Sequence, residues 1–182
     1  MFSHRLDRRA ELRMLEPRHA DELFALTDRN RERLREWLPW VDGTKSADDT
    51  LKFIRDSLKR HAETGDVAAG IWSGAKLAGV IGLHIRGEAR AMIGYWLGEE
   101  FEGKGLMTLA CRAMVDHAFR DLGVERVEIF AEPRNRRSRA IPKRLGFQRE
   151  GTLRHVAKLN DRFIDHVVYS LLRDEWAAAS PR

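Results

Sequence analysis

Residues 93–122 read IGYWLGEEFEGKGLMTLACRAMVDHAFRDL, and this stretch holds the most informative change of pattern in the chain. The apolar residues from Ala91 to Leu97 are typical of a buried strand. From Met107 to Leu122, apolar residues recur every three or four positions, which predicts an amphipathic helix. The loop between these two segments ends in Glu102-Gly103-Lys104-Gly105-Leu106, with two glycines close to the start of the helix. We therefore expect a strand, a glycine-bearing loop and a helix N-terminus in succession.

A loop of this kind attracts phosphate. The first turn of a helix leaves backbone N–H groups unpaired, and glycine lets a pyrophosphate approach the backbone closely. Two nucleotide motifs do not fit: a dinucleotide fingerprint needs glycine where Thr108 stands, and a triphosphate loop needs Ser or Thr where Gly105 stands. Because two glycines also suit a plain turn, Gly103 and Gly105 alone leave both interpretations open.

Short strands and helices alternate on both sides of this stretch. The candidate strands are residues 12–15, 67–72, 77–85, 91–97, 127–131, 147–157 and 163–172. The candidate helices are residues 20–27, 46–58, 107–122 and 135–145. Tight turns separate the three consecutive strands from 67 to 97, which predicts an antiparallel meander. The fold class is α/β or α+β, in the order strand, two helices, three strands, helix, strand, helix, two strands.

Length and composition favour a single domain over residues 1–182. The longest stretches without a charged residue are nine residues, well short of a membrane span. The N-terminus has no apolar signal region, and Cys111 has no partner for an internal disulfide, so we expect the cytoplasm. A net charge of +5 is a small excess that favours an anionic ligand.

Several motifs carry a family resemblance in their order and spacing. They are Ile93–Leu97, Gly103-Lys104-Gly105, Asn135-Arg136-Arg137-Ser138 and Leu145-Gly146-Phe147. Together they resemble the GNAT N-acetyltransferases. Four segments resemble the RimJ/RimL branch, which acetylates protein N-termini: Trp37-Leu38-Pro39-Trp40, Asn135-x-x-Ser138, Phe147-x-x-Glu150-Gly151 and the tail from Asn160 to Trp176. The resemblance spans nearly the whole chain and implies a mixed, mostly antiparallel central sheet flanked by helices.

The resemblance implies acetyl-CoA as cosubstrate and no metal. The loop would hold the pyrophosphate, and the strand through Trp96 and Leu97 would pair with the pantetheine amides. The implied cofactor-binding residues are Trp96, Leu97, Gly98, Glu102, Gly103, Lys104, Gly105, Leu106, Met107, Thr108, Asn135, Arg137 and Ser138. Glu102 departs from the superfamily pattern, and its carboxylate should repel a pyrophosphate unless it turns to solvent or pairs with Lys104 or an arginine.

Ser138 is the candidate donor of the proton that the departing thiolate needs. Many superfamily members use a tyrosine, but Tyr95 and Tyr169 both lie outside the segment where that tyrosine occurs. Asn135 suits a helix N-cap as well as a cofactor contact. Pro142 lacks the N–H that would bond the carbonyl of Ser138, so that carbonyl should stay free, in a short or kinked helix. A backbone N–H near Leu97 is the implied oxyanion donor.

Three residues are candidates for the base that accepts the amine proton: Glu150, His84 and His155. Glu150 fits best because it matches the family-like Glu-Gly pair, and Gly151 suggests a β-bulge near a site. A solvent-facing strand carboxylate explains Glu150 equally well, and the two histidines suit ordinary strand positions. Cys111 is rejected as a nucleophile because it lies on the apolar stripe of its helix.

The acceptor side is less well defined by sequence. Trp37, Trp40 and His84 are the candidate substrate-binding residues, although the two tryptophans also suit a plain core. The basic cluster from Arg134 to Arg144 admits three interpretations: a solvated helix face, a clamp for the 3′-phosphate of CoA, or an RNA surface. We favour the clamp, formed by Arg136, Arg137 and Arg139. RNA is the weakest interpretation because no aromatic residue interrupts the cluster.

The first functional hypothesis is an N-acetyltransferase that acts on a protein N-terminal amine, of the ribosomal-protein type, by direct attack in a ternary complex. The alternatives are the same chemistry on a polyamine, amino acid or aminoglycoside, and a catalytically silent module that binds CoA or RNA. No membrane partner is expected. Pairing of sheet edges into a homodimer is compatible with the sequence.

Overall fold

The computed structural model describes residues 3–179 of the 182-residue chain, and they form one eight-stranded sheet. The strands are β1 (Ser3–Arg5), β2 (Ala10–Met14), β3 (Val67–Ser73), β4 (Lys76–Arg86), β5 (Arg90–Leu97), β6 (Arg126–Ala131), β7 (Gln148–Leu159) and β8 (Arg162–Leu172). Their order in the sheet is β1-β2-β3-β4-β5-β6-β8-β7. Every pairing is antiparallel except that of β5 with β6. The expected mixed, mostly antiparallel sheet is confirmed.

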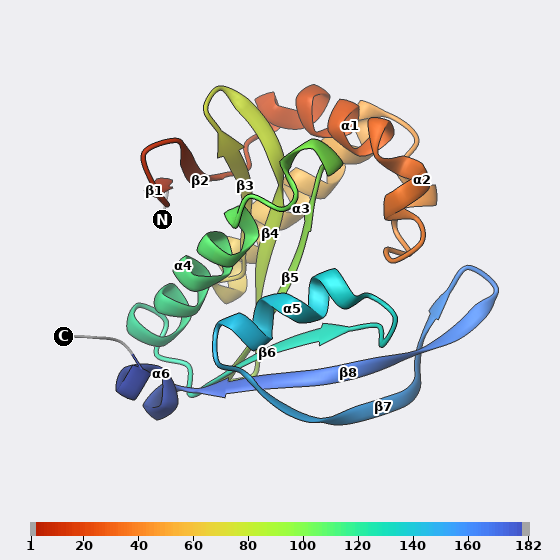
Figure 1. Cartoon of the computed structure of the whole chain (residues 1–182). Helices are drawn as coiled ribbons and strands as arrows, with labels where there is room; N and C mark the ends of the chain where they lie inside the picture. Colours follow the sequence, from red (N-terminus) through yellow and green to blue (C-terminus); the bar gives the residue numbers. More distant parts are fainter. Residues whose placement is uncertain (1–2, 180–182) are drawn as a thin grey trace.

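Helices cover both faces of the sheet. The α-helices are α1 (Ala20–Arg29), α2 (Arg31–Leu34), α3 (Ala47–Thr64), α4 (Leu106–Arg120), α5 (Arg136–Arg144) and α6 (Arg173–Ala179). Figure 1 shows α4 and α5 in front of the sheet and α3 behind it. Short 3-10 turns lie at Pro17–His19, Val41–Gly43 and Glu99–Phe101. No helix of the described residues is long and apolar enough to span a membrane.

The local signals in the sequence explain how the helices begin and end. The Ser46 side chain accepts from the N–H of Asp49, and the Asp49 carboxylate accepts from the N–H of Ser46, which is the expected capping box. This helix continues past the expected end at residue 58 to Gly65, whose φ of 82° caps it in the left-handed region. Three elements were not expected from the sequence, namely β1, α2 and α6, and all three are short.

The long helix α4 packs its apolar stripe on the sheet, as its periodicity predicts. Cys111 and Met114 are fully buried in the core. Burial raises the pKa of the Cys111 thiol, so it stays protonated and inaccessible, consistent with its rejection as a nucleophile.

The feature that positions the site is a separation of β5 from β6. β5 pairs with β4 from Arg90 to Leu97, but pairs with β6 only from Arg90 to Met92. Beyond this point β6 continues to Ala131 in register with β8. The second half of β5 therefore has one paired edge and one edge that faces the space between the strands. We call this space the wedge.

Candidate active site

Two cavities meet at the wedge. The first, of about 580 Å³, lies between the segment after α2, the end of β5, the start of α5 and the β7–β8 hairpin. The second, of about 940 Å³, lies over the glycine loop, the start of α4 and the opposite side of α5. Both are lined by Tyr95, Leu97, Glu102, Arg137 and Ser138. These five residues mark where a ligand in one cavity would touch a ligand in the other.

The backbone of β5 presents polar groups to the wedge. The N–H of Gly98 donates to the carbonyl of Ala78 at 2.8 Å, which makes these residues a hydrogen-bonded pair of the antiparallel ladder. The preceding pair, Gly79 with Leu97, is then a non-hydrogen-bonded pair. Consequently the N–H and carbonyl of Leu97 point away from β4. The carbonyl accepts from Arg33 Nη2 at 2.5 Å, and the N–H faces the wedge.

The glycine loop has the conformation that its sequence predicts. Gly103 and Gly105 have φ of 74° and 75°, a backbone conformation that residues with a side chain rarely adopt. Gly105 is the N-cap of α4. The loop residues and the first turn of the helix line the second cavity: Glu102, Gly103, Gly105, Leu106, Met107 and Thr108. First-turn N–H groups thus border a space large enough for a phosphate-bearing ligand.

Two of the expected cofactor residues do not line either cavity. Gly98 is buried, and a Cβ there would lie 3.0 Å from Leu26 Cδ1, so its small size serves packing against α1. Lys104 is exposed; its Nζ donates to the carbonyl of Glu100 at 2.7 Å and lies over the ring of Phe101. Neither residue therefore contributes to the surface of the second cavity.

Glu102 is neutralised by two arginines. Its carboxylate forms ion pairs with Arg33 and with Arg137, one on each oxygen. Of the three arrangements that the sequence left open for Glu102, pairing with an arginine is the one present, while Lys104 is engaged elsewhere. The pairing removes much of the repulsion that a lone carboxylate would exert on a phosphate. It also joins α2, the loop and α5 at the junction of the cavities.

Ser138 lies in the first turn of α5, beside Tyr95. Asn135 Oδ1 accepts from the N–H of Ser138 at 3.0 Å, so Asn135 is the N-cap of this helix, and it also lines the first cavity. The carbonyl of Ser138 accepts from the Tyr95 hydroxyl at 2.9 Å. Pro142 inside the helix frees that carbonyl, as its position predicts, and the helix is short.

Aromatic side chains form one wall of the first cavity. Trp37 and Trp96 line it, with the guanidinium of Arg134 6.0 Å from the centre of the Trp37 ring. Trp40 packs on Trp96 with ring centroids 6.1 Å apart and is 40% exposed. Trp37 therefore borders the first cavity, as expected of a substrate-binding residue. Trp40 is too exposed for plain core, but it lines neither cavity, so the expectation that it binds substrate is corrected.

The chain matches the GNAT acetyltransferase domain over residues 9–148. It belongs to the GNAT acetyltransferase family. It is 38% identical over 179 residues to YdaF of Bacillus subtilis, which carries a provisional name as a ribosomal N-acetyltransferase; the match covers 97% of this chain and 98% of that protein.

Two solved structures show the same architecture. RimL, a ribosomal-protein α-N-acetyltransferase in complex with coenzyme A, superposes with a TM-score of 0.89 at 26% identity, over 94% of this chain and 98% of that one. A microcin C7 self-immunity acetyltransferase in complex with acetyl-CoA and AMP gives 0.86 at 28% identity, over 92% and 94%. This GNAT protein is an acetyl-CoA-dependent N-acetyltransferase with RimJ/RimL-type relatives, as the sequence motifs indicated.

The residues at the wedge of this GNAT protein suit acetyl-CoA. The unpaired edge of β5 offers backbone groups to the amides of an extended pantetheine chain, and the loop offers first-turn N–H groups to a pyrophosphate. Arg137 and Arg144 add positive charge around the second cavity. Nothing among these described residues obstructs that fit, because Glu102 is already paired.

Glu150 does not take the place expected of a catalytic base. It lines neither cavity, and both carboxylate oxygens accept from Arg126 at 2.6 Å, while Ser170 Oγ donates to one of them at 2.7 Å. The hydrogen bonds from Arg126 hold the pKa of Glu150 down to about 2. A carboxylate this acidic is a poor base at neutral pH, so the expectation is corrected. The expected bulge next to Gly151 is present.

The two histidine candidates are also placed elsewhere. His84, near the end of β4, lines neither cavity. Its Nδ1 lies 3.1 Å from Oδ2 of the buried Asp66, which precedes β3. The expectation that His84 binds substrate or acts as the base is therefore wrong. His155 lies on the exposed part of β7, with its ring stacked on Phe163 at 5.7 Å.

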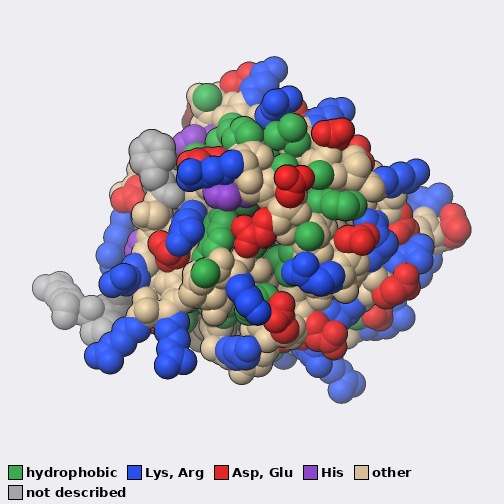
Figure 2. All heavy atoms as spheres, turned by 90° about the horizontal axis from the view of Figure 1, so that it is seen from above, with side chains coloured by type: hydrophobic (Ala, Val, Ile, Leu, Met, Phe, Trp, Pro, Cys, Tyr) green, Lys and Arg blue, Asp and Glu red, His purple; other side chains and the backbone are tan. Residues whose placement is uncertain are grey.

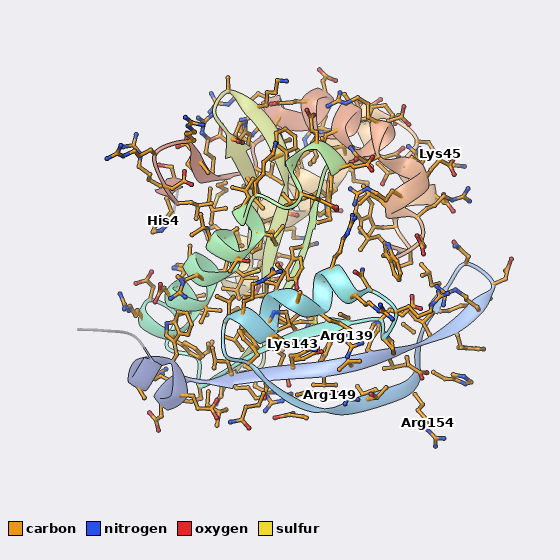
Figure 3. The ribbon with its side chains drawn as sticks, viewed as in Figure 1. His4, Lys45, Arg139, Lys143, Arg149 and Arg154 are labelled. Atoms are coloured by element: carbon orange, nitrogen blue, oxygen red, sulfur yellow. The ribbon has the colours of Figure 1, made fainter. Side chains whose placement is uncertain are left out.

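The basic cluster divides into two groups. Arg139 donates to the Tyr169 hydroxyl at 3.1 Å and to the carbonyl of Pro133 at 2.6 Å, so it braces α5 against β8 and is not part of a phosphate clamp. Figure 3 shows Arg139 on the side of α5 that faces β8. Arg136 and Arg137 line the first cavity. On the face shown in Figure 2, basic and acidic side chains alternate, unlike the basic stripe of a nucleic-acid surface.

Tyr95 is a site residue that the sequence did not predict. It lines both cavities, and its hydroxyl also lies 3.4 Å from Ser138 Oγ. Burial raises the pKa of the Tyr95 hydroxyl, so it stays protonated as a donor. The available signal was its position in β5, where it lies two residues before Leu97 and so faces the same way.

Proposed function

We propose that this enzyme transfers the acetyl group of acetyl-CoA to the N-terminal amine of a protein chain, of the ribosomal-protein type. The observation that carries the proposal is the junction of two cavities at Leu97 and Ser138, one bordered by the glycine loop and the other open toward the β7–β8 hairpin. The second cavity suits the CoA moiety, and the first suits the acceptor. The RimL relative supports this assignment because it is named as an α-N-acetyltransferase of a ribosomal protein.

For direct transfer the chain must supply a hydrogen-bond donor for the developing oxyanion and a proton for the departing thiolate. Bound acetyl-CoA supplies the thioester that the amine attacks. The Leu97 N–H would donate to the oxygen of the reacting carbonyl, where negative charge develops, and loss of one such donor typically costs about a hundredfold or more in rate. Ser138 would donate its hydroxyl proton to the departing thiolate, with Tyr95 fixing the turn on which Ser138 lies. No covalent acyl-enzyme is needed.

The charge of the first cavity favours a peptide over a polyamine. Five basic side chains line it, namely Arg33, Arg134, Arg136, Arg137 and Lys158, against the three acidic ones Glu36, Glu102 and Glu132. Glu132 is further neutralised by Arg134 at 2.7 Å and by Arg162 at 3.0 Å. A polycation would meet like charge here. A neutral or acidic N-terminal segment, with its aromatic contacts to Trp37 and Trp96, suits these walls.

The test is a comparison of acceptors at fixed acetyl-CoA. Peptides with free N-termini, the same peptides with blocked N-termini, spermidine and free amino acids would be assayed by thiol release. The proposal predicts turnover with free N-termini only. Turnover with spermidine alone would overturn the peptide assignment, while CoA binding without turnover of any amine would point to a silent module.

The proposal includes the compartment in which the enzyme acts and its oligomeric state. A single domain acting in the reducing cytoplasm accords with a lone cysteine that is buried. The exposed edge strand β7 would be available for pairing with a second copy. Sedimentation equilibrium of the whole chain would test the homodimer.

A further inference from the structure

The first cavity is lined by a histidine, His166, to which no role has been assigned. His166 is the one histidine among the described residues that line either cavity. It lies on β8 two positions after Ile164, so the two side chains share a face of the strand, and both line the first cavity. Its ring stacks on Phe130 of β6, with centroids 6.2 Å apart and planes inclined by 16°. This packing holds the imidazole in the cavity wall.

The other groups of this cavity that accept protons are engaged or exposed. Both oxygens of Glu102 are paired with arginines. Glu132 accepts from Arg134 at 2.7 Å and from Arg162 at 3.1 and 3.0 Å, and these bonds lower its pKa despite burial. Glu36 is exposed to solvent. By contrast, neither ring nitrogen of His166 has a hydrogen-bond partner among the residues that the structure describes.

The surroundings of His166 favour the neutral form of its imidazole. Burial lowers its pKa, and the nearby carboxylates of Glu132 and Asp165 oppose this only in part. A neutral imidazole has a lone pair that can accept a proton near neutral pH.

We propose that His166 is the catalytic base that accepts the proton of the acceptor amine. The inference rests on the proposed function, because it needs an amine in the first cavity. Two observations carry it: His166 lines the first cavity, and its imidazole has no hydrogen-bond partner among the described residues. Proton acceptance by a positioned side chain typically contributes about a hundredfold or more to the rate.

The amine nitrogen forms a bond to the acetyl carbon, the C–S bond breaks, and the amine proton moves to His166. The sulfur takes a proton from the Ser138 hydroxyl. The imidazolium then returns its proton to Ser138 through solvent, so that the net reaction moves one proton from the amine to the thiol.

The experiment compares His166→Gln and His166→Ala with His155→Gln, a matched control on the same hairpin but outside both cavities. The wild-type chain must first show acetyl transfer to a peptide; absence of transfer there is a failure of the proposed function and not of this inference. With transfer present, we expect kcat to fall about a hundredfold in both His166 variants, and to stay at the wild-type value in the control.

Two readouts separate a base from a structural residue. Added imidazole should restore rate to His166→Ala but not to His166→Gln, and substituted imidazoles of higher pKa should restore more. The melting temperature should still rise with CoA in every variant, which shows an intact cofactor site. The proposal would be overturned if kcat were unchanged in both His166 variants, or if only KM changed. It would also be overturned if Glu36→Gln lost kcat while His166→Gln did not.

Discussion

The hydroxyl of Tyr95, at the end of β5, donates a hydrogen bond of 2.9 Å to the main-chain carbonyl of Ser138 in α5. This bond links β5 to α5, the helix that follows β6, beyond Met92 where β5 and β6 are no longer paired. It also uses the carbonyl that Pro142 leaves without a helical partner. The cofactor strand and the helix that carries Ser138 are thus fixed relative to each other by one tyrosine.

Removal of this hydroxyl should affect rate and stability together. In Tyr95→Phe, the carbonyl of Ser138 loses its partner, which costs about 1–3 kcal/mol of stability. We expect kcat to fall about tenfold as Ser138 loses its position, measured by thiol release. Tyr169→Phe is the control, because its hydroxyl accepts from Arg139 outside both cavities. Equal rates in the two variants would contradict a positioning role for Tyr95.

Gly79 is required by the close approach of β5 to β4. A Cβ at Gly79 would lie 2.2 Å from the carbonyl oxygen of Trp96 and 2.9 Å from Leu97 Cα, both of them backbone atoms. Gly79→Ala should therefore displace the Leu97 N–H, and a displacement of about 1 Å can cost about a hundredfold in rate. Gly43→Ala, which meets nothing within 4 Å, is the control. Full activity in Gly79→Ala would show that the position of the Leu97 N–H does not matter for acetyl transfer.

Arg137 is expected to exchange its carboxylate partner for phosphate. It lines both cavities and pairs with Glu102. Loss of one charge-assisted contact should weaken CoA binding about tenfold in Arg137→Gln, measured by calorimetry, and the difference from wild type should shrink at high salt. Arg149→Gln, on β7 and away from the loop (Figure 3), should bind CoA normally. Identical affinities for wild type and Arg137→Gln would exclude the contact.

Glu150 should matter for acid stability and not for catalysis. Its hydrogen bonds from Arg126 hold its folded-state pKa near 2, below the value of about 4.3 in an unfolded chain. Because the pKa is lower in the folded state, the ionised carboxylate stabilises the fold at pH values above the unfolded-state pKa. This stabilisation is lost as the pH falls from about 5 to about 2. Denaturation of wild type and Glu150→Gln should therefore differ at pH 7 and converge near pH 2. A large loss of kcat in Glu150→Gln would instead indicate that Glu150 is the catalytic base.

Local patterns in the sequence predicted most of the fold. The change from strand to helical periodicity around Gly103 and Gly105 located the cofactor loop, and the Ser46–Asp49 capping box located the start of α3. The position of Pro142 predicted a free carbonyl at Ser138. Each of these inferences depends on residues within one or two turns of chain, where backbone geometry decides the outcome.

Pairing between distant side chains could not be predicted in the same way. Glu150 lies 24 residues from Arg126, and the two meet only because β8 lies between β6 and β7 in the sheet. The same applies to Tyr95 and Ser138, which are 43 residues apart. The residue types alone left Glu150 as a free carboxylate and Tyr95 as a strand residue. The strand order decides which partner each side chain has.

The most direct test of the central claim is tandem mass spectrometry of a protein or peptide acceptor after incubation with the enzyme and acetyl-CoA. The account predicts one acetyl group, located on the α-amine of the first residue, and its absence when Ser138→Ala replaces the wild-type enzyme. Acetylation confined to lysine side chains, or an acceptor left unmodified while CoA binds, would contradict it.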